Sequence, residues 1–193
     1  MKKSIILTVL MAFFTITTQM YSQFSGELSG GLSIPQDSDS KSMFNQGLYG
    51  GLGLTYRIMN SLDIMTVLHY HRFTDTQENR FGSYTTTVNA TIEYMPIMVG
   101  ARYTFTEGGL QPFVSASIGS ASGKAIIATV SNIVPNNTTE ITETFGAVSI
   151  AGGVKMSINA QLSLLGMAEY TKLEKDTDKI EMLALKVGLG VSM

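Results

Sequence analysis

The sequence contains no cysteine and no tryptophan, only 4 prolines, and few charged residues for a chain of 193 residues. A chain without cysteine is not a disulfide scaffold and offers no thiolate ligand to a metal ion. Charged residues make up 15% of the chain, whereas they make up roughly 25% of a typical soluble protein. So small a share of charge would leave much of a soluble surface apolar, which favours an exterior that faces lipid.

Long hydrophobic runs are missing too, apart from a short one near the N-terminus. Lys2 and Lys3 precede an almost entirely apolar stretch over residues 5–14, and polar residues follow it. This order is that of a secretory signal peptide, and the stretch is shorter than the roughly 20 residues of a membrane-spanning helix. We predict a signal peptide over residues 1–22 and one mature domain over residues 23–193.

Removal of this signal peptide leaves an acidic mature chain. Of the 13 lysines and arginines, 11 remain against 15 aspartates and glutamates, so the formal net charge becomes −4. This balance excludes a basic nucleic-acid-binding protein, and we expect no nucleic-acid partner.

Eight segments of the mature chain alternate apolar residues with small or polar ones, which is the period of a β-strand. They cover residues 24–34, 46–56, 61–71, 91–105, 110–118, 144–156, 160–170 and 180–193. Each is close to the roughly 9–11 residues of a tilted transmembrane strand. Met65, Val67 and Phe113 break the alternation. The pattern predicts an all-β fold, namely an eight-stranded antiparallel up-and-down transmembrane β-barrel.

The connections between these segments alternate between long and short. The long or intermediate ones cover residues 35–45, 72–90, 120–143 and 171–179, and the short ones cover 57–60, 106–109 and 157–159. In transmembrane barrels the short turns are periplasmic and the longer loops are external. We therefore expect four external loops and both termini in the periplasm.

If the apolar parity of each segment faces lipid, the ionisable residues of the other parity face the lumen. These residues are Glu27, Asp63, Arg102, Lys155, Glu169 and Lys186. Buried charges must be paired, and an eight-stranded barrel is just wide enough for side chains to fill it. We predict a network of salt bridges that plugs the lumen. The alternative is a narrow porin-like channel lined by the same charges.

Two histidines, His69 and His71, lie two residues apart and so point to the same side of a strand, near the predicted outer rim. Such a pair could bind a metal ion or supply a base. The spacing fixes no third ligand and singles out no serine as a nucleophile. We therefore predict no metal site, no cofactor and no enzymatic activity.

Two stretches resemble a known family. Residues 95–105 read MPIMVGARYTF and residues 108–114 read GGLQPFV. They are similar to the fourth and fifth strands of the outer membrane β-barrel family, which includes OmpA-like and OmpX-like domains, and residues 186–193 resemble its closing strand. The resemblance implies an eight-stranded barrel in the outer membrane and no single activity, because the fold hosts many. The chain departs from the family pattern by ending in Met193 rather than in phenylalanine or tryptophan.

Our first functional hypothesis is a monomeric structural or surface-interaction barrel. It would contact outer-membrane lipid and lipopolysaccharide through its wall and an extracellular partner through its loops. Three alternatives remain, namely a narrow pore, an outer-membrane enzyme that modifies lipid, and a soluble lipocalin-like carrier. The carrier would need a polar exterior and an apolar cavity, the reverse of the parity assigned above.

Overall fold

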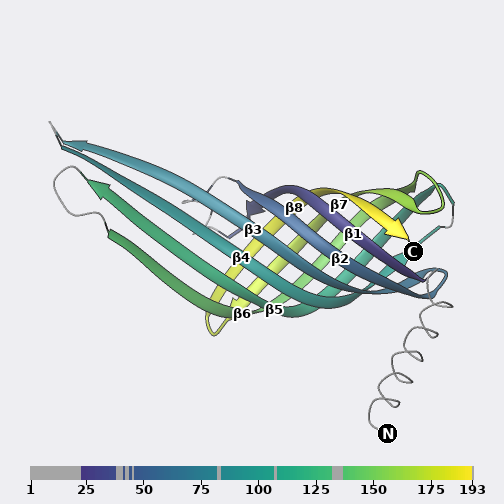
Figure 1. Ribbon diagram of the computed structural model, residues 1–193. Helices are drawn as coiled ribbons and strands as arrows, with labels where there is room; N and C mark the ends of the chain where they lie inside the picture. The colour runs from purple at the N-terminus through teal and green to yellow at the C-terminus, as the bar shows by residue number, and fades with distance from the viewer. Residues whose placement is uncertain are drawn as a thin grey trace, which may run out of the picture.

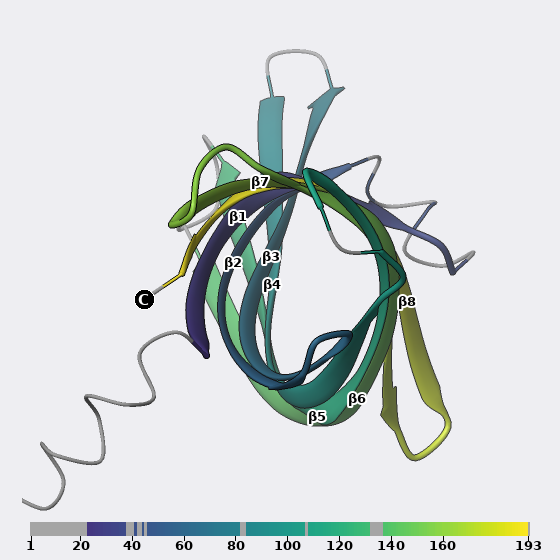
Figure 2. The same cartoon turned by 90° about the vertical axis from the view of Figure 1, so that its right-hand side faces the viewer.

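In the computed structural model, eight antiparallel strands form one closed barrel (Figures 1 and 2). The structure describes residues 23–37, 41, 44, 46–81, 84–106, 108–131 and 137–192. The strands are β1 (Phe24–Pro35), β2 (Gly47–Met59), β3 (Leu62–Phe81), β4 (Tyr84–Thr104), β5 (Leu110–Ser131), β6 (Asn137–Ser157), β7 (Leu162–Lys175) and β8 (Asp178–Ser192). The predicted fold class is confirmed, whereas the predicted signal peptide lies outside the described residues.

Neighbouring strands in the sequence pair with each other, and β1 pairs with β8 to close the ring. The closing pairs run from Ser25 opposite Ser192 to Pro35 opposite Met182. Figure 2 looks along the barrel and shows this ring. Within the described residues, no helix is long and apolar enough to cross a membrane.

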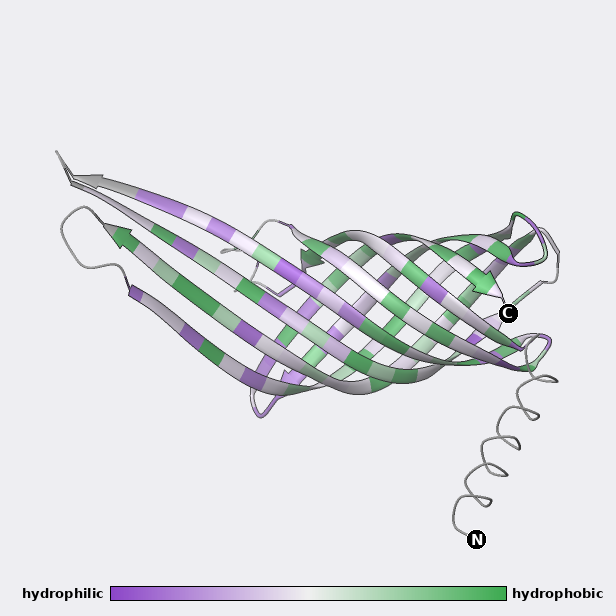
Figure 3. Ribbon diagram, in the orientation of Figure 1, coloured by the Kyte–Doolittle hydropathy of each residue, from purple (hydrophilic) through white to green (hydrophobic). Residues whose placement is uncertain are grey.

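Side chains alternate between the outside and the inside of the barrel, as the pleat of a strand requires. On β8, Val187 is 71% exposed whereas the adjacent Lys186 is 3% exposed. Figure 3 shows hydrophobic and hydrophilic residues alternating along the strands. The exterior is a band of exposed apolar side chains that includes Leu28, Leu52, Leu54, Ile97, Val99, Ile118, Ile150 and Leu189. This band confirms the predicted lipid-facing parity and contradicts the soluble-carrier alternative.

The residues that break the alternation in the sequence point inward. Met65, Val67 and Phe113 are all buried in the structure. They interrupt the pattern because the lumen holds apolar side chains as well as polar ones, so an apolar residue is not always a lipid-facing residue.

Four strands are much longer than a membrane crossing requires. Strands β3 to β6 contain 20 to 22 residues, whereas the other four contain 12 to 15. Pairing of β3 with β4 continues to Phe81 opposite Tyr84, and pairing of β5 with β6 continues to Thr129 opposite Asn137. The expectation that residues 72–90 and 120–143 are loops is therefore wrong for most of their length.

The physical reason for this error is the environment of the added residues. They are rich in threonine, valine and isoleucine, which favour strands. Because neither face of these extensions lies against lipid, the apolar–polar alternation that marks the membrane band is lost.

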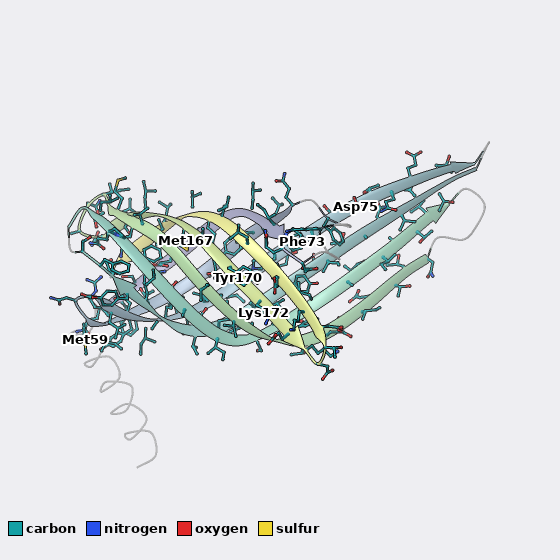
Figure 4. All side chains as sticks on the ribbon, turned by 180° about the vertical axis from the view of Figure 1, so that it is seen from behind. Met59, Phe73, Asp75, Met167, Tyr170 and Lys172 are labelled. Atoms are coloured by element: carbon teal, nitrogen blue, oxygen red, sulfur yellow. The ribbon has the colours of Figure 1, made fainter. Side chains whose placement is uncertain are left out.

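The long strands all project at one end of the barrel. In Figure 1, β3 to β6 extend well past the hairpin of β7 and β8, and the C-terminal end of β8 lies at the opposite end. Met59 and Asp75, labelled in Figure 4, lie toward these two opposite ends. We call the end with the projecting strands the long-strand end and the other one the short-turn end.

Candidate functional site

The lumen contains a buried ion pair between Glu27 of β1 and Arg102 of β4. Arg102 Nη2 lies 2.8 Å from Glu27 Oε2, and Arg102 Nη1 contacts Glu27 Oε1, so two parallel hydrogen bonds join the groups. The guanidinium carbon of Arg102 also lies 4.5 Å from the ring centroid of Phe113. A bidentate pair of this kind is stronger than a single hydrogen bond between neutral groups.

A second buried cluster surrounds the Glu169 carboxylate on β7. Lys186 Nζ lies 2.7 Å and His69 Nδ1 lies 3.1 Å from Glu169 Oε1. Thr171 donates a hydrogen bond to the same oxygen at 3.2 Å. The ammonium of Lys186 lies 4.1 Å from the ring centroid of Tyr49, which is a cation–π contact. The contacts of Lys186 with Glu169 and with the Tyr49 ring offset part of the cost of burying the lysine charge.

The remaining predicted charges, Asp63 and Lys155, lie close to the short-turn end of their strands. Asp63 Oδ1 is 3.3 Å from Arg57 Nε, and sequence reasoning had placed Arg57 in a turn rather than in the network. Lys155 is partly buried and forms no ion pair with another described residue. Of the six predicted lumenal charges, the structure therefore brings four together as two pairs and leaves Lys155 apart.

His69 and His71 are not at the rim, so that prediction is wrong. The predicted strand ended at residue 71, but β3 continues to Phe81, and both histidines are buried inside the barrel. His71 Nδ1 lies 2.9 Å from Ser33 Oγ, and the Tyr49 ring packs against both imidazoles. Among the residues that the structure describes, no three histidine, cysteine, aspartate or glutamate side chains gather as metal ligands would.

A layer of apolar side chains lies beside the charges, toward the long-strand end. On β4, β7 and β8, an apolar residue follows each buried charge four positions nearer that end. Met98 follows Arg102 in this way, Leu173 follows Glu169 and Met182 follows Lys186. The three apolar residues are at most 1% exposed. Phe44, Phe73, Tyr94 and Phe145 complete the layer. The sequence pattern does not predict this layer. The broken alternation at Met65 and Val67 is its only trace in the sequence, because both side chains are buried in the lumen.

Little empty space remains among the charged residues. A cavity of about 20 Å³ lies between the two clusters, lined by Glu27, Tyr49, Arg102, Glu169 and Lys186 among others. A space of that size holds about one water molecule.

A much larger cavity of about 540 Å³ opens at the long-strand end, which we call the mouth cavity. Its apolar lining residues include Tyr94, Phe145, Ile92 and Ile180. Its charged lining residues are Asp37, Glu143, Asp178, Lys124 and Lys179. Lys175 Nζ lies 3.1 Å from Glu143 Oε1 and so ties the β7–β8 hairpin to β6.

Charge is distributed unevenly between the two ends of the molecule. The described residues within 36–46, 72–93, 124–143 and 172–181 belong to the long-strand end, and they include ten acidic and seven basic residues. The other described residues include three acidic and four basic ones. Among the described residues, the excess of negative charge therefore belongs to the long-strand end.

The outer face of the β7–β8 hairpin carries an exposed ion pair. Lys172 Nζ lies 2.5 Å from Glu174 Oε1. The hydrogen bond from Lys172, together with its positive charge, lowers the pKa of the Glu174 carboxyl below its usual value. This pair faces away from the mouth cavity, so a substitution of Glu174 does not change the lining of that cavity.

A closed ring of eight strands with an apolar outer band and buried charges on its inner side is the architecture of a transmembrane β-barrel. The chain belongs to the outer membrane protein beta-barrel domain family, whose model matches residues 5–192. It is therefore a protein of the cell outer membrane. A comparison with curated protein sequences finds no match.

Several solved barrels share the fold. Neisserial surface protein A is 15% identical, with a TM-score of 0.56 over 88% of this chain and 97% of that one. Ail of Yersinia pestis, in complex with the heparin analogue sucrose octasulfate, is 14% identical, with a TM-score of 0.51 over 87% and 99%. The outer membrane protease OmpT of Escherichia coli is 6% identical, with a TM-score of 0.50 over 90% and 97%. At these identities the likeness shows the fold alone.

Proposed function

We propose that this protein is a monomeric outer-membrane anchor that presents its long-strand end to a partner outside the cell. The observation that carries the proposal is the length of β3 to β6. Roughly 9–11 residues suffice to cross the membrane as a tilted strand, whereas these strands contain 20 to 22. The surplus forms a paired four-stranded sheet in the aqueous phase, and a rigid scaffold of this kind suits recognition.

The proposal includes a closed lumen rather than a porin-like channel. Two barriers lie in series along the barrel, first the ion pairs of Glu27 and Glu169 and then the apolar layer around Phe73. An ion would have to break the first barrier and shed its water to pass the second. Eight-stranded barrels also leave little interior space once side chains fill it.

We also propose that the protein is not an enzyme. Ser33 and His71 form a serine–histidine pair at 2.9 Å, which is the beginning of a catalytic triad. Both side chains are fully buried, however, and the nearby acid Glu169 contacts His69 instead of His71. A substrate could not reach this serine, and no acid among the described residues orients its histidine.

The likeness to Ail supports a role at the cell surface and also suggests a difference. The structure of Ail, an attachment invasion locus protein, contains a heparin analogue that is a polysulfate. The described residues at the long-strand end of the present chain include ten acidic against seven basic ones. Repulsion between like charges disfavours a polyanionic ligand here.

The test is cell attachment by a Gram-negative host that expresses either the full chain or a chain with shortened strands. In the shortened chain, Asn-Gly hairpin turns replace residues 77–88 and 125–141. We expect the full chain to increase attachment to cultured epithelial monolayers and the shortened chain to lose that gain. Heat-modifiable gel mobility and surface amount must stay unchanged. Equal attachment by both chains would overturn the proposal.

A further inference from the structure

The mouth cavity is a formed space with an apolar floor. The rings of Tyr94 and Phe145 are buried and meet edge to face, with centroids 6.1 Å apart. Ile92 and Ile180 line the wall above them. A volume of about 540 Å³ lies within the usual size of small-ligand sites, roughly 300–1,000 Å³.

Apolar side chains that no other described residue covers continue this floor along the inner face of the projecting sheet. Ile141 lines the cavity and is 53% exposed, and it lies opposite Ala125 in the pairing of β5 with β6. Ile127, two residues farther along β5, has the same parity and is 46% exposed. Exposed apolar side chains that gather beside a cavity are typical of interaction surfaces.

The charges around this floor favour a cation. Asp37, Glu143 and Asp178 line the cavity together with Lys124 and Lys179. Two of these charges are already paired, because Lys124 directs its ammonium to Glu140 at 2.7 Å and Glu143 lies 3.1 Å from Lys175 Nζ. Beyond the cavity itself, acidic residues outnumber basic ones among the described residues of the long-strand end. The surrounding potential therefore attracts a positively charged group and repels an anion.

We propose that the mouth cavity binds a basic peptide segment, with an apolar side chain on the Tyr94–Phe145 floor and a flanking lysine or arginine side chain at Asp178. The proposal rests on the surface-interaction role proposed above and names the chemistry of the partner. The lipid matrix is a poorer occupant, because the cavity opens on the inner side of the barrel wall, whereas lipid contacts the outer band.

The direct test uses the mature chain in nanodiscs of zwitterionic phosphatidylcholine and fluorescence anisotropy of short labelled peptides. The probe is a peptide of alternating lysine and phenylalanine. In one control peptide glutamate replaces lysine, and in the other serine replaces phenylalanine. We expect saturable binding of the probe alone, weakened as salt rises from about 50 mM to about 500 mM because the attraction is screened. Empty nanodiscs give the background.

Two pairs of variants locate the site. Ala125→Phe fills the cavity from its wall, and its control Ile126→Phe adds the same ring on the outer face of β5. Asp178→Lys changes the charge at the cavity, and its control Glu174→Lys makes the same change on the outer face of β7. We expect binding of the probe to weaken roughly ten-fold or more in Ala125→Phe and Asp178→Lys and to change little in their controls.

The outcomes separate this inference from the proposed function. Equal binding to Ala125→Phe and Ile126→Phe, or equal binding of the acidic and the basic peptide, overturns the inference. If no peptide binds while the full chain still promotes cell attachment, the inference fails and the proposed function stands. If the probe binds at the cavity while attachment does not depend on the projecting strands, the proposed function fails. Unchanged heat-modifiable mobility shows that each variant is folded.

Discussion

At the scale of single residues, the Glu169 carboxylate holds the second buried cluster together. It contacts Lys186, His69 and Thr171, and both Glu169 and Lys186 are 3% exposed. Removing the acid would leave the lysine ammonium buried without its counter-charge. Breaking a buried pair in this way is strongly destabilising, because the remaining charge is neither solvated nor paired.

We therefore expect Glu169→Gln to lower the free energy of unfolding by about 3 kcal/mol. Urea unfolding in lipid vesicles, followed by far-UV circular dichroism, would measure the change. The control Glu174→Gln removes an exposed carboxylate and should cost less than about 0.5 kcal/mol. Adding Lys186→Met to Glu169→Gln should recover part of the loss, since it removes the unpaired charge. Equal effects of the two single variants would contradict the pairing.

A second residue-scale prediction concerns two adjacent glycines on β2. A Cβ atom at Gly51 would lie 2.1 Å from the Tyr49 hydroxyl, whereas one at Gly50 would meet nothing within 4 Å. Gly51→Ala must displace the ring that covers Lys186, and overpacking of this kind costs about 1–3 kcal/mol. Gly50→Ala should be neutral or slightly stabilising. The same urea titration compares the two, and a larger loss at residue 50 would refute the inward position of Tyr49.

The sequence predicts which charges face inward but not which of them pair. Parity alone places Glu27, Arg102, Glu169 and Lys186 in the lumen. Glu27 and Arg102 are 75 residues apart and lie on β1 and β4, so their meeting depends on how far each strand is staggered around the ring. Parity contains no information about that stagger. The alternation ends at residue 71, which led to the prediction that His69 and His71 lie near the rim. Because β3 continues to Phe81, both histidines lie deeper inside the barrel.

At the scale of elements, the four projecting strands differ in how fully they are paired. Beyond the membrane band, β4 and β5 have a neighbour on each side, whereas β3 and β6 pair only with β4 and β5 respectively. Pairing of β2 with β3 ends at Arg72, and pairing of β6 with β7 ends at Gly146. The projecting sheet therefore has two open edges.

We expect hydrogen exchange to report these edges. Amides of residues 85–92 on β4 and 123–130 on β5 should be protected, whereas about half of those at 73–78 on β3 and 138–145 on β6 should exchange rapidly. Exchange followed by mass spectrometry on the protein in nanodiscs would measure the difference. Uniformly fast exchange in all four segments would show that the sheet does not persist outside the membrane.

The extensions also show where sequence reasoning reaches its limit at this scale. A strand that crosses lipid must alternate, because one of its faces meets hydrocarbon and the other meets the lumen. Residues such as Thr87 and Thr138 lie in water on both faces, so nothing requires them to alternate. Their β-branched side chains favour a strand, but this signal is weaker than a period of two, so the sequence pattern alone predicts a loop.

At the scale of the whole molecule, the absence of cysteine allows a direct test of orientation. The signal peptide over residues 1–22 and the periplasmic position of both termini remain predictions, and they require the long-strand end to face outward. Asp75→Cys in intact cells should react with a membrane-impermeant maleimide, and Met59→Cys should react only after the outer membrane is opened. The reverse pattern would invert the proposed topology, and the cysteine-free parent serves as the background control.

The two barriers in the lumen lead to a prediction about conductance. Lys186→Ala and Glu169→Ala remove charges from one barrier, but the apolar layer of Phe73, Tyr94 and Phe145 remains. We expect these variants to conduct no more than the parent in planar bilayers, and we expect a rise only when Phe73→Gly and Phe145→Gly are added. A stable, ion-selective conductance of the parent chain would support the porin-like alternative.

The closing seam between β1 and β8 has a consequence for biosynthesis. Strand β1 is translated first, but its partner β8 is translated last, and Ser25 pairs with Ser192. The seam can therefore form only after the whole chain has been made. A polypeptide truncated after β7 would expose two rows of unpaired peptide groups, and hydrocarbon does not tolerate such groups. The strands therefore cannot insert into the membrane one at a time. A chain that ends before β8 cannot close the ring, and we expect it to remain outside the membrane.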